Sequence, residues 1–349
     1  MLLFFNVNTY IISTERNNTG VTEMNSEKKV LLIGGGGTLG TYTAEELLRL
    51  GCQVDILCPE EKTSENSRLR FIRGYATLRF LNDVLKSNKY DGIVNFVLYR
   101  SLEEYKPVHK ILSENTEHLI FVSSYRVYAD CAHPITEQAP LLADVVYDEH
   151  FLSTEDYALP KTKCEKFLRD GSNTYNWTVV RPVISFSEKR LDLVTVTGHE
   201  IIEKAEAGKE LLLPQAAKNL TAGLDWAGNS GKLIANLMFK PKCFEKAYTV
   251  SSAPNLKWGE VAEIYKKLTG IKIRWVSTEE YVETGHGGYG LFYDRLFNRE
   301  IDNTKILEAT GLKKDDFVSI ENGIKIELAK LGFHKNEGAK AKNKRIMFL

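Results

Sequence analysis

The sequence predicts an α/β protein: a doubly wound parallel sheet with helices on both faces, and a smaller mixed α/β domain after it. Short apolar runs of strand length alternate with amphipathic stretches of helical length through the first half of the chain. This regular alternation weakens after Pro182. The 349 residues, 43% of them hydrophobic and 26% charged, suffice for one large core or two domains.

The first half contains five runs that we expect to be strands. Their hydrophobicity is continuous rather than alternating, as in strands buried on both faces of a parallel sheet. They are KVLLI (29–33), QVDILC (53–58), GIVNFV (92–97), LIFVS (119–123) and WTVVR (177–181). Helical patterns lie between them, at 42–51, 82–86, 102–114 and 157–169. The order of these elements predicts successive strand–helix–strand units.

The second half has a different pattern. Residues 211–214, 224–239 and 247–251 indicate mixed strands and helices, residues 258–268 an amphipathic helix, and residues 283–290 a glycine-rich loop. We expect residues 183–334 to form the smaller domain. Some segments between 220 and 252 are expected to return to the first domain.

The balance of charge and the placement of cysteine and histidine argue against nucleic-acid-binding, membrane-binding and metal-binding classes of protein. The 46 Lys and Arg balance the 46 Asp and Glu, so no bulk field favours nucleic acid or an anionic membrane. The five cysteines are scattered without a CxxC pair, which predicts reduced thiols in a cytoplasmic protein. The seven histidines show neither HxH nor HExxH spacing, so we predict no metal site.

Both ends of the chain are expected to lie outside the folded part. Residues 1–13 are apolar but lack a positive region before them and are too short to span a bilayer. Met24 precedes the first strand as a natural start would, and we expect residues 1–26 to form a disordered extension. The alternative is a degenerate membrane or signal segment. Residues 335–349 are expected to form a solvated basic tail, with a partner-binding tail as the alternative.

A glycine-rich stretch, GGGGTLG at 34–40, follows the first strand and opens a helix. Gly34 permits the tight turn, Gly37 lets the backbone approach a phosphate, and Gly40 lets the helix pack closely on the sheet. Thr38 and Leu39 begin the helix, whose free N–H groups favour a diphosphate. This context predicts that residues 27–182 form a Rossmann-type dinucleotide-binding domain. The alternative is a merely flexible loop.

A tyrosine and a lysine stand four residues apart in Tyr157-Ala-Leu-Pro-Lys161, a spacing that places both on one helix face. An ammonium beside a phenol lowers the pKa of the phenol, which can then exchange a proton with a substrate oxygen. Ser124, after an upstream strand, offers a hydroxyl to the same oxygen. The alternative is a surface tyrosine and lysine on an amphipathic helix.

These motifs resemble those of the extended short-chain dehydrogenases/reductases, in the NAD-dependent epimerase/dehydratase family. The resemblance covers roughly residues 28–315. It rests on the glycine loop, FVSSYRVY (121–128), the Tyr–Lys pair and VVRPVIS (179–185), and more weakly on 220–228, 246–252 and 299–312.

The resemblance implies a catalytic set of Ser124, Tyr157 and Lys161, a bound NAD or NADP and a small-molecule substrate, a nucleotide-sugar in many members. Subunits of this fold often pair through two helices, so a homodimer is expected. The cofactor contacts would be Gly34, Gly37, Thr38, Leu39, Gly40, Asn95, Tyr157 and Lys161. Substrate contacts would come from Ser124, Arg181 and Arg295.

Several residues depart from the family pattern on the adenosine side of the cofactor. Cys58 stands where an acid often binds the adenosine ribose, and Glu60 or Glu61 are possible substitutes. Tyr75 replaces a common Asp, and Phe96 adds bulk beside the groove. The choice between NAD and NADP therefore stays open.

Two further departures concern the catalytic set. Pro160 directly precedes Lys161, which a helix tolerates only if it begins near Asp156. Ser124-Tyr125-Arg126 lacks the acidic pair of a 4,6-dehydratase, so the residues favour epimerisation or reduction over dehydration.

Two functions follow from the sequence. The first is an NAD(P)-dependent epimerase or reductase that acts on a hydroxyl or carbonyl by Tyr–Lys assisted hydride transfer. The second is a non-catalytic dinucleotide sensor or RNA-associated module of the same fold, suggested by the altered adenosine side and the basic tail. The Ser–Tyr–Lys set favours the enzyme, because a sensor has no need of an activated phenol.

Overall fold

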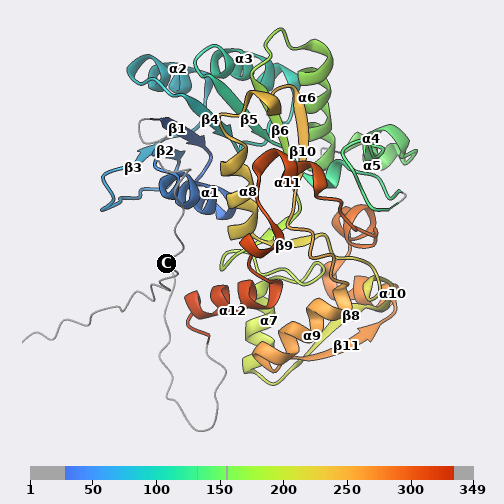
Figure 1. Cartoon of the computed structure of the whole chain (residues 1–349). Coiled ribbons are helices and arrows are strands. Elements are labelled where there is room, and N and C mark those ends of the chain that lie inside the picture. Colours follow the sequence, from blue (N-terminus) through green and yellow to red (C-terminus); the bar gives the residue numbers. More distant parts are fainter. Residues whose placement is uncertain (1–27, 132, 155, 334–349) are drawn as a thin grey trace, which may run out of the picture.

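The computed structural model describes residues 28–131, 133–154 and 156–333 (Figure 1). The expected extension at 1–26 and the expected tail at 335–349 lie outside the described residues. The strands are β1 (Lys29–Ile33), β2 (Gln53–Cys58), β3 (Leu69–Arg73), β4 (Gly92–Asn95), β5 (His118–Val122), β6 (Trp177–Pro182), β7 (Ile184–Phe186), β8 (Glu210–Pro214), β9 (Leu224–Trp226), β10 (Lys246–Val250) and β11 (Lys272–Val276). The helices are α1 (Thr38–Arg49), α2 (Leu78–Ser87), α3 (Leu102–Ser113), α4 (Leu142–Val145), α5 (Glu149–Ser153), α6 (Ala158–Gly171), α7 (Gly198–Glu206), α8 (Ala227–Leu237), α9 (Trp258–Thr269), α10 (Thr278–Tyr281), α11 (Thr304–Thr310) and α12 (Ile320–Lys330).

A seven-stranded parallel sheet forms the upper part of the molecule in Figure 1, in the order β10-β6-β5-β4-β1-β2-β3. This order confirms the predicted doubly wound Rossmann-type fold. Ile33 lies opposite both Leu57 and Asn95, and Asn95 lies opposite Phe121. The carboxyl ends of the four central strands therefore meet along one edge of the sheet, where the direction of strand order reverses between β1 and β4.

Two strands of this sheet are not among the five that the first half predicts. The edge strand β3 has no fully buried residue, so its sequence, LRFIR, lacks a continuous apolar run. β10 comes from the second half of the chain and pairs with β6 in parallel, from Lys246 opposite Thr178 to Val250 opposite Pro182.

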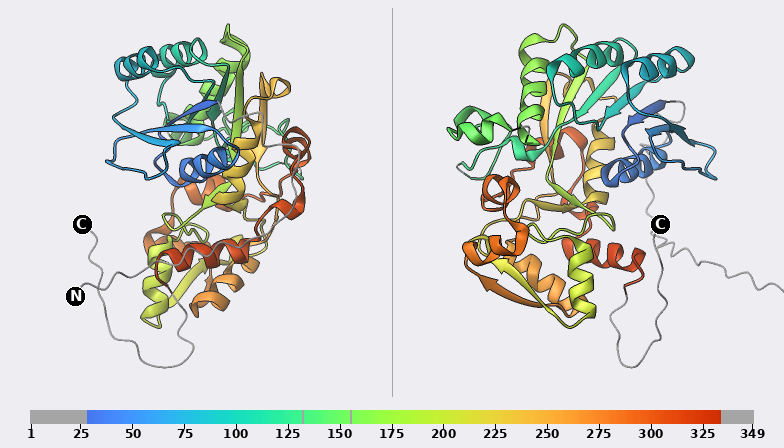
Figure 2. Two further views of the ribbon diagram at one scale, coloured as in Figure 1. Left: turned by 60° about the vertical axis from the view of Figure 1, so that its left-hand side comes forward. Right: turned by 180° about the vertical axis from the view of Figure 1, so that it is seen from behind.

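Helices cover both faces of the sheet (Figure 2). On one face Leu31 and Ile33 pack with apolar residues of α2, α3 and α6. On the other face Val30 and Leu32 pack with α1, α8 and α11. The central strands are thus buried on both sides, which explains their continuous hydrophobicity. The helices α8 and α11 and the strand β10 return to the sheet after the chain has passed through the smaller lobe.

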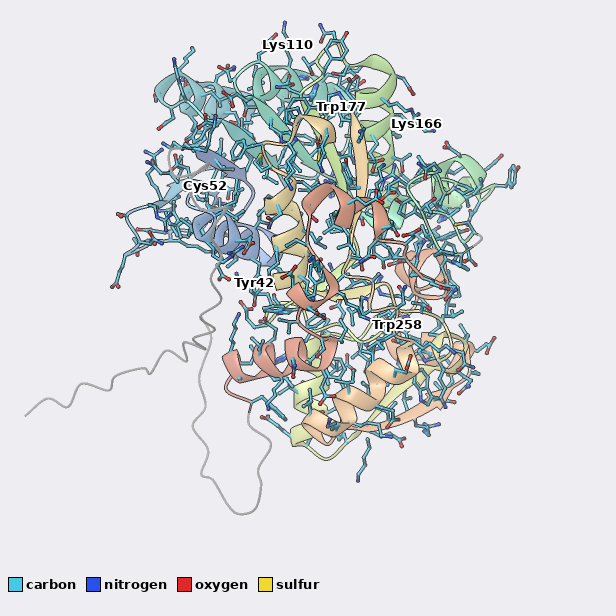
Figure 3. All side chains as sticks on the ribbon, in the orientation of Figure 1. Tyr42, Cys52, Lys110, Lys166, Trp177 and Trp258 are labelled. Atoms are coloured by element: carbon cyan, nitrogen blue, oxygen red, sulfur yellow. The ribbon has the colours of Figure 1, made fainter. Side chains whose placement is uncertain are left out.

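The smaller lobe has its own core below the sheet in Figure 1, around the parallel pair β8–β11. Trp258, at the start of α9, is 1% exposed and lies in this core (Figure 3). The helix α9 ends at Gly270, which has a φ of 77°. A residue in this left-handed conformation ends a helix, as glycine commonly does. The predicted helix at 258–268 is present.

The described part of the chain lacks the marks of a membrane-spanning helix and of a metal-binding cluster. Within it, no helix combines the length and apolar composition needed to cross a membrane. No group of three or more His, Cys, Asp or Glu side chains is placed to hold a metal ion in those ranges. All five cysteines are free thiols.

Candidate active site

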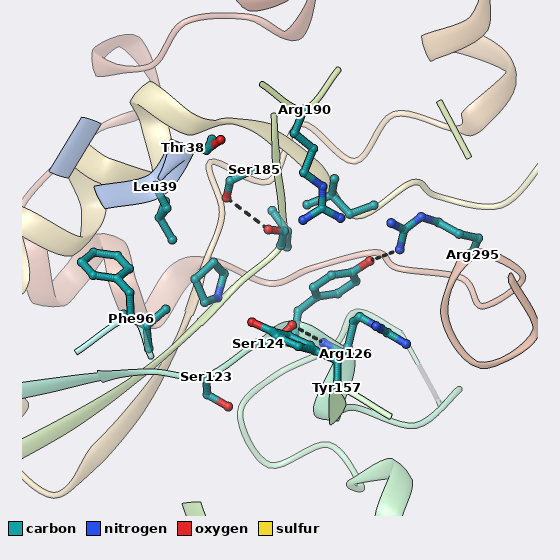
Figure 4. Close-up of a pocket in the computed structure, with 15 residues that line it drawn as sticks. Thr38, Leu39, Phe96, Ser123, Ser124, Arg126, Tyr157, Ser185, Arg190 and Arg295 are labelled. Carbon is teal, nitrogen blue, oxygen red and sulfur yellow. Dashed lines mark hydrogen bonds between the residues drawn. The ribbon is translucent and has the colours of Figure 1, made fainter. Parts of the chain in front are cut away.

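A pocket of about 430 Å³ opens at the carboxyl edge of the large sheet (Figure 4). Thr38 and Leu39 of α1 line one side of it, and Ser124 and Tyr157 line another. Residues of the smaller lobe, including Arg190 and Arg295, complete the wall. Open α/β sheets bind ligands at this kind of edge, where the strand order reverses. The pocket therefore joins the glycine loop and the Ser–Tyr pair that the sequence singles out.

The glycine loop has the backbone that its sequence predicts. Gly34 has a φ of 72°, which permits the turn out of β1. A Cβ atom at Gly40 would lie 2.3 Å from the carbonyl oxygen of Gly35, so α1 can approach the loop only with glycine there. Gly37 is different, because a Cβ atom there would meet nothing within 4 Å. The chain leaves open space at Gly37, where a diphosphate would approach the loop.

The first turn of α1 is left free for a ligand. Gly37 is its N-cap and no side chain caps the helix. The Thr38 hydroxyl bonds instead to the Ser187 hydroxyl, 2.9 Å away on the loop after β7. Helix N–H groups without a capping partner bind anions readily.

Three charged side chains surround the carbonyl of Gly36. Lys62 and Lys189 both donate to this oxygen, at 2.8 and 3.4 Å. The Glu60 carboxylate lies beside the same residue, 3.0 Å from where a Cβ atom of Gly36 would stand. Glu61 points elsewhere and pairs with Arg73 at 2.9 Å. Of the two acids considered from the sequence, Glu60 is the one beside the glycine loop.

Ser124 follows β5 and caps the short 3₁₀ turn η1 (Tyr125–Val127). Its hydroxyl oxygen accepts a hydrogen bond from the backbone N–H of Arg126 at 3.2 Å. The hydroxyl hydrogen therefore stays available to a ligand oxygen. Ser124 is 6% exposed and lines the pocket, so the sheet edge holds this hydroxyl at the pocket wall.

Tyr157 stands at the N-cap of α6 and also lines the pocket. Its side chain is 37% exposed, and no hydrogen bond within the described ranges uses its hydroxyl. Burial raises the pKa of Tyr157, while the charges of Arg190 and Arg126 lower it. The charges of these two arginines therefore oppose the effect of burial on the phenol.

Lys161 lies beneath the tyrosine and is 1% exposed. Its ammonium donates to the carbonyls of Val97 (3.0 Å) and Val122 (2.6 Å) and lies 5.9 Å from the centre of the Tyr157 ring. Burial lowers the pKa of Lys161 to about 8. The lysine is therefore anchored to the ends of β4 and β5, within reach of the tyrosine but not bonded to it.

Pro160 is compatible with this geometry. The helix α6 begins at Ala158, which places Pro160 in its first turn, where a backbone N–H has no partner within the helix. The proline thus removes no helical hydrogen bond.

Asn95, at the end of β4, is expected from the sequence to contact the cofactor, but in the structure its side chain binds neighbouring residues of the chain. The Asn95 side chain is 1% exposed, donates to the Tyr99 hydroxyl at 2.9 Å and accepts from the N–H of Val97 at 3.1 Å. Phe96, and not Asn95, lines the pocket. Asn95 thus fixes the turn that carries Phe96 and Val97, and no pattern in the sequence around it indicates this role.

Comparison with known proteins decides the family. The model of the NAD dependent epimerase/dehydratase family matches residues 30–227, which is more than half of the chain. This chain belongs to that family. The matched region contains the glycine loop, Ser124, Tyr157 and Lys161.

Curated relatives are more distant. A UDP-glucose 4-epimerase of Lactobacillus helveticus is 28% identical in an alignment of 134 residues that covers 32% of this chain and 41% of that protein. A UDP-glucose 4-epimerase of Lacticaseibacillus casei is 27% identical in an alignment of 147 residues that covers 36% of this chain and 44% of that protein. The chain thus matches less than half the length of these relatives.

Solved structures share the fold. An epimerase from Methanothermobacter thermautotrophicus has a TM-score of 0.65 at 15% identity and covers 87% of this chain and 94% of its own. A UDP-glucose 4-epimerase from Thermus thermophilus, solved with NAD, has a TM-score of 0.61 at 16% identity. The match covers 86% of this chain and 98% of that protein. The resemblance extends over both lobes.

In this family member the substrate candidate Arg181 lies outside the pocket. It is 5% exposed, and its guanidinium donates to Glu165 of α6 at 3.0 Å and to the Tyr128 hydroxyl at 3.0 Å. The arginine ties β6 to α6. Its neighbour Pro182 lines the pocket in its place.

We expect Arg181→Met to lower the free energy of unfolding by about 3–5 kcal/mol, because it leaves the Glu165 carboxylate buried without its partner. The double variant Arg181→Met/Glu165→Leu should regain most of this loss. Urea unfolding measures both. A fully stable Arg181→Met protein with weakened substrate affinity would contradict this structural role.

Three arginines line the pocket, and the sequence singles out only Arg295 as a contact. Arg126 follows Ser124 by two residues. From the sequence, it shows only that this stretch lacks the acidic pair of a 4,6-dehydratase. Arg190 lies on the turn after β7, in a stretch with no motif. Nothing local in the sequence marks Arg190, because the fold of the smaller lobe brings it to the pocket.

Proposed function

We propose that this chain is an NAD-dependent epimerase that inverts a hydroxyl-bearing carbon of a nucleotide-sugar. The observation that carries the proposal is the pocket itself, in which an available serine hydroxyl and an unbonded tyrosine hydroxyl stand beside an open glycine loop. The curated relatives, both UDP-glucose 4-epimerases, support a nucleotide-sugar as substrate.

The described residues fit a dinucleotide. Open space at Gly37 and the uncapped start of α1 suit its diphosphate. Lys62 and Lys189 share one carbonyl oxygen, and neither has an ion pair within 4.0 Å among the described side chains. These two ammonium groups beside the glycine loop would attract the negative charges of a diphosphate. When bound, NAD would accept a hydride from the substrate and return it.

The roles of the protein side chains follow from their hydrogen bonds. The Ser124 hydroxyl would donate to the substrate oxygen and hold it toward Tyr157. The Tyr157 hydroxyl would take the proton from that oxygen and later give it back. Lys161, held by two carbonyls below the ring, would place positive charge near the phenol and the cofactor ribose. Arg190 and Arg126 would favour the phenolate by their charge.

The adenosine end would be held by Glu60, and NAD would be preferred to NADP. A carboxylate accepts the two ribose hydroxyls of NAD and repels a 2′-phosphate. We expect Glu60→Gln to weaken NADH binding about tenfold or more, the loss typical of a hydrogen bond to a charged group, and to narrow the preference over NADPH. Fluorescence titration with both cofactors measures this.

Glu61→Gln is the matched control, because Glu61 pairs with Arg73 on the exposed side and faces away from the loop. It should bind both cofactors as the wild type does. Equal effects of the two substitutions would count against Glu60 as the ribose ligand.

The proposed activity is tested with the purified full chain. Bound NAD(H) is measured after denaturation, and a panel of nucleotide-sugars, including UDP-glucose, is followed by NMR for inversion at a hydroxyl carbon. Inversion without net cofactor reduction is expected. Net reduction or oxidation of the cofactor would indicate a reductase instead. Cofactor binding without turnover of any sugar would favour the sensor, and failure to bind any dinucleotide would refute both.

A further inference from the structure

The charge of the pocket lining is one-sided. Its fifteen residues include Arg126, Arg190 and Arg295 and no Asp or Glu. These arginines come from three separate segments: the turn η1, the loop after β7 and the helical turn η5 (Leu291–Arg295). Their acidic partners Asp156, Asp192 and Asp294 lie outside the lining, with side chains at most 14% exposed.

Arg295 is fully engaged by the protein. Its Nε donates to the Val194 carbonyl at 2.9 Å, its Nη1 donates to the Tyr125 hydroxyl at 3.2 Å, and it forms an ion pair with Asp294. Asp294 is completely buried. Arg295 thus supports the wall of the pocket and has little capacity left for a ligand.

Arg126 retains donors that the protein does not use. Its Nη2 binds both oxygens of Asp156, at 3.0 and 3.2 Å, and its buried Nε lies 3.6 Å from the Asp294 carboxylate, but its Nη1 has no hydrogen bond to a described residue. Its guanidinium carbon lies 5.8 Å from the centre of the Tyr157 ring. A cation with a free donor therefore stands directly beside the candidate acid/base (Figure 4).

Arg190 reaches the same pocket from the smaller lobe, and its charge acts on the Tyr157 phenol. Its Nε donates to Asp192 at 2.7 Å, and the structure gives its terminal amino groups no hydrogen bond to a described residue. The side chain is half exposed, so these groups are accessible from the pocket. Arg190 and Arg126 thus present two guanidinium groups to the pocket that Ser124 and Tyr157 also line.

Resting on the proposed function, we propose that the substrate carries a carboxylate next to the reacting hydroxyl, as a nucleotide-linked uronic acid does, and that Arg126 and Arg190 bind it. A guanidinium matches a carboxylate with paired, charge-assisted hydrogen bonds, which a neutral hydroxymethyl group cannot form. The position matters, because Arg126 stands beside Tyr157 and Arg190 lines the same pocket, so that both would contact the sugar rather than the adenosine end of the cofactor.

The test compares UDP-glucuronate, UDP-glucose and UDP, which share the diphosphate and differ in the sugar. Their dissociation constants are measured by calorimetry on the NAD-loaded full chain. We expect the wild type to bind UDP-glucuronate about tenfold to a hundredfold more tightly than UDP-glucose. Arg126→Gln and Arg190→Gln should each remove most of this preference, because each should weaken the binding of UDP-glucuronate about tenfold more than the binding of UDP-glucose.

Two further variants keep the result interpretable. Arg126→Lys retains the charge and should retain part of the preference. Arg274→Gln removes an exposed arginine of β11, paired with Glu210 and Glu280, and should change neither affinity.

The outcomes separate this inference from the proposed function. Equal wild-type affinities for UDP-glucuronate and UDP-glucose would overturn the inference and leave the epimerase proposal intact. Equal losses for all three ligands in the glutamine variants would assign the arginines to the diphosphate and also overturn it. Failure of every nucleotide-sugar to bind would overturn both proposals. If a glutamine variant fails to fold, the wild-type preference alone decides.

Discussion

Tyr157→Phe is expected to lower kcat by about two to four orders of magnitude while dinucleotide binding stays close to that of the wild type. The substitution removes one oxygen, and the described residues give that oxygen no hydrogen bond to lose. The folded state should therefore lose little stability. The proton would have no acceptor, so hydride transfer from the substrate would leave an unstable protonated carbonyl.

The measurement pairs initial rates on the best nucleotide-sugar with an NADH titration and a thermal unfolding scan. Tyr147→Phe is the matched control, because Tyr147 is 93% exposed and lies outside the pocket lining. Its rate should equal that of the wild type. If Tyr157→Phe retains full activity with normal cofactor binding, another group moves the proton and the assignment of Tyr157 fails.

The second large effect is expected at two glycines that lie three residues apart. Gly37→Val should cost at most about 1 kcal/mol of stability, because valine is a poorer N-cap than glycine, but it should weaken NADH binding by about a hundredfold, or about 2.7 kcal/mol. Gly37 has a φ of −86°, and the protein offers a side chain there only open space. That space is where the diphosphate would approach the loop.

Gly40→Ala should instead lower stability directly and weaken cofactor binding only through that loss. Its new methyl group would overlap the backbone of Gly35, only 2.3 Å from the carbonyl oxygen. The free energy of unfolding is expected to fall by at least about 1–3 kcal/mol, the range typical of overpacking. Cofactor binding should be lost as a consequence. Thermal unfolding without ligand and NADH titration separate the two effects. Wild-type affinity in a stable Gly37→Val protein would show that no diphosphate sits on this loop.

The sequence predicts those parts of the fold that rest on local pattern. The strand KVLLI at 29–33 is evident because burial on both faces produces a continuous apolar run. The start of the helix that follows is evident from the regular spacing of Gly34, Gly37 and Gly40. The strand β3 is not evident, because an edge position needs no such run. Pairing of β10 with β6 joins segments about seventy residues apart, and no local pattern specifies it.

The candidate site shows the same division. Ser124, Tyr157 and Lys161 stand in recognisable motifs, and the fold brings the first two to one pocket. The anchoring of Lys161 by two backbone carbonyls was not predictable, because those carbonyls belong to the ends of other strands. Arg190 and Lys189 reach the pocket and the glycine loop from a turn whose sequence carries no motif.

The late return of α8, β10 and α11 to the large sheet has a consequence for how the chain can be divided. One face of β1 packs on apolar residues of these elements, including Leu233, Val250 and Ile306. A fragment that stops at Pro182 would keep α1 on that face but expose the area that α8, β10 and α11 cover, although it contains the entire Ser–Tyr–Lys set. The two lobes are therefore interleaved along the chain. They must fold as one cooperative unit, and distant segments must meet before the sheet is complete, which favours slow folding.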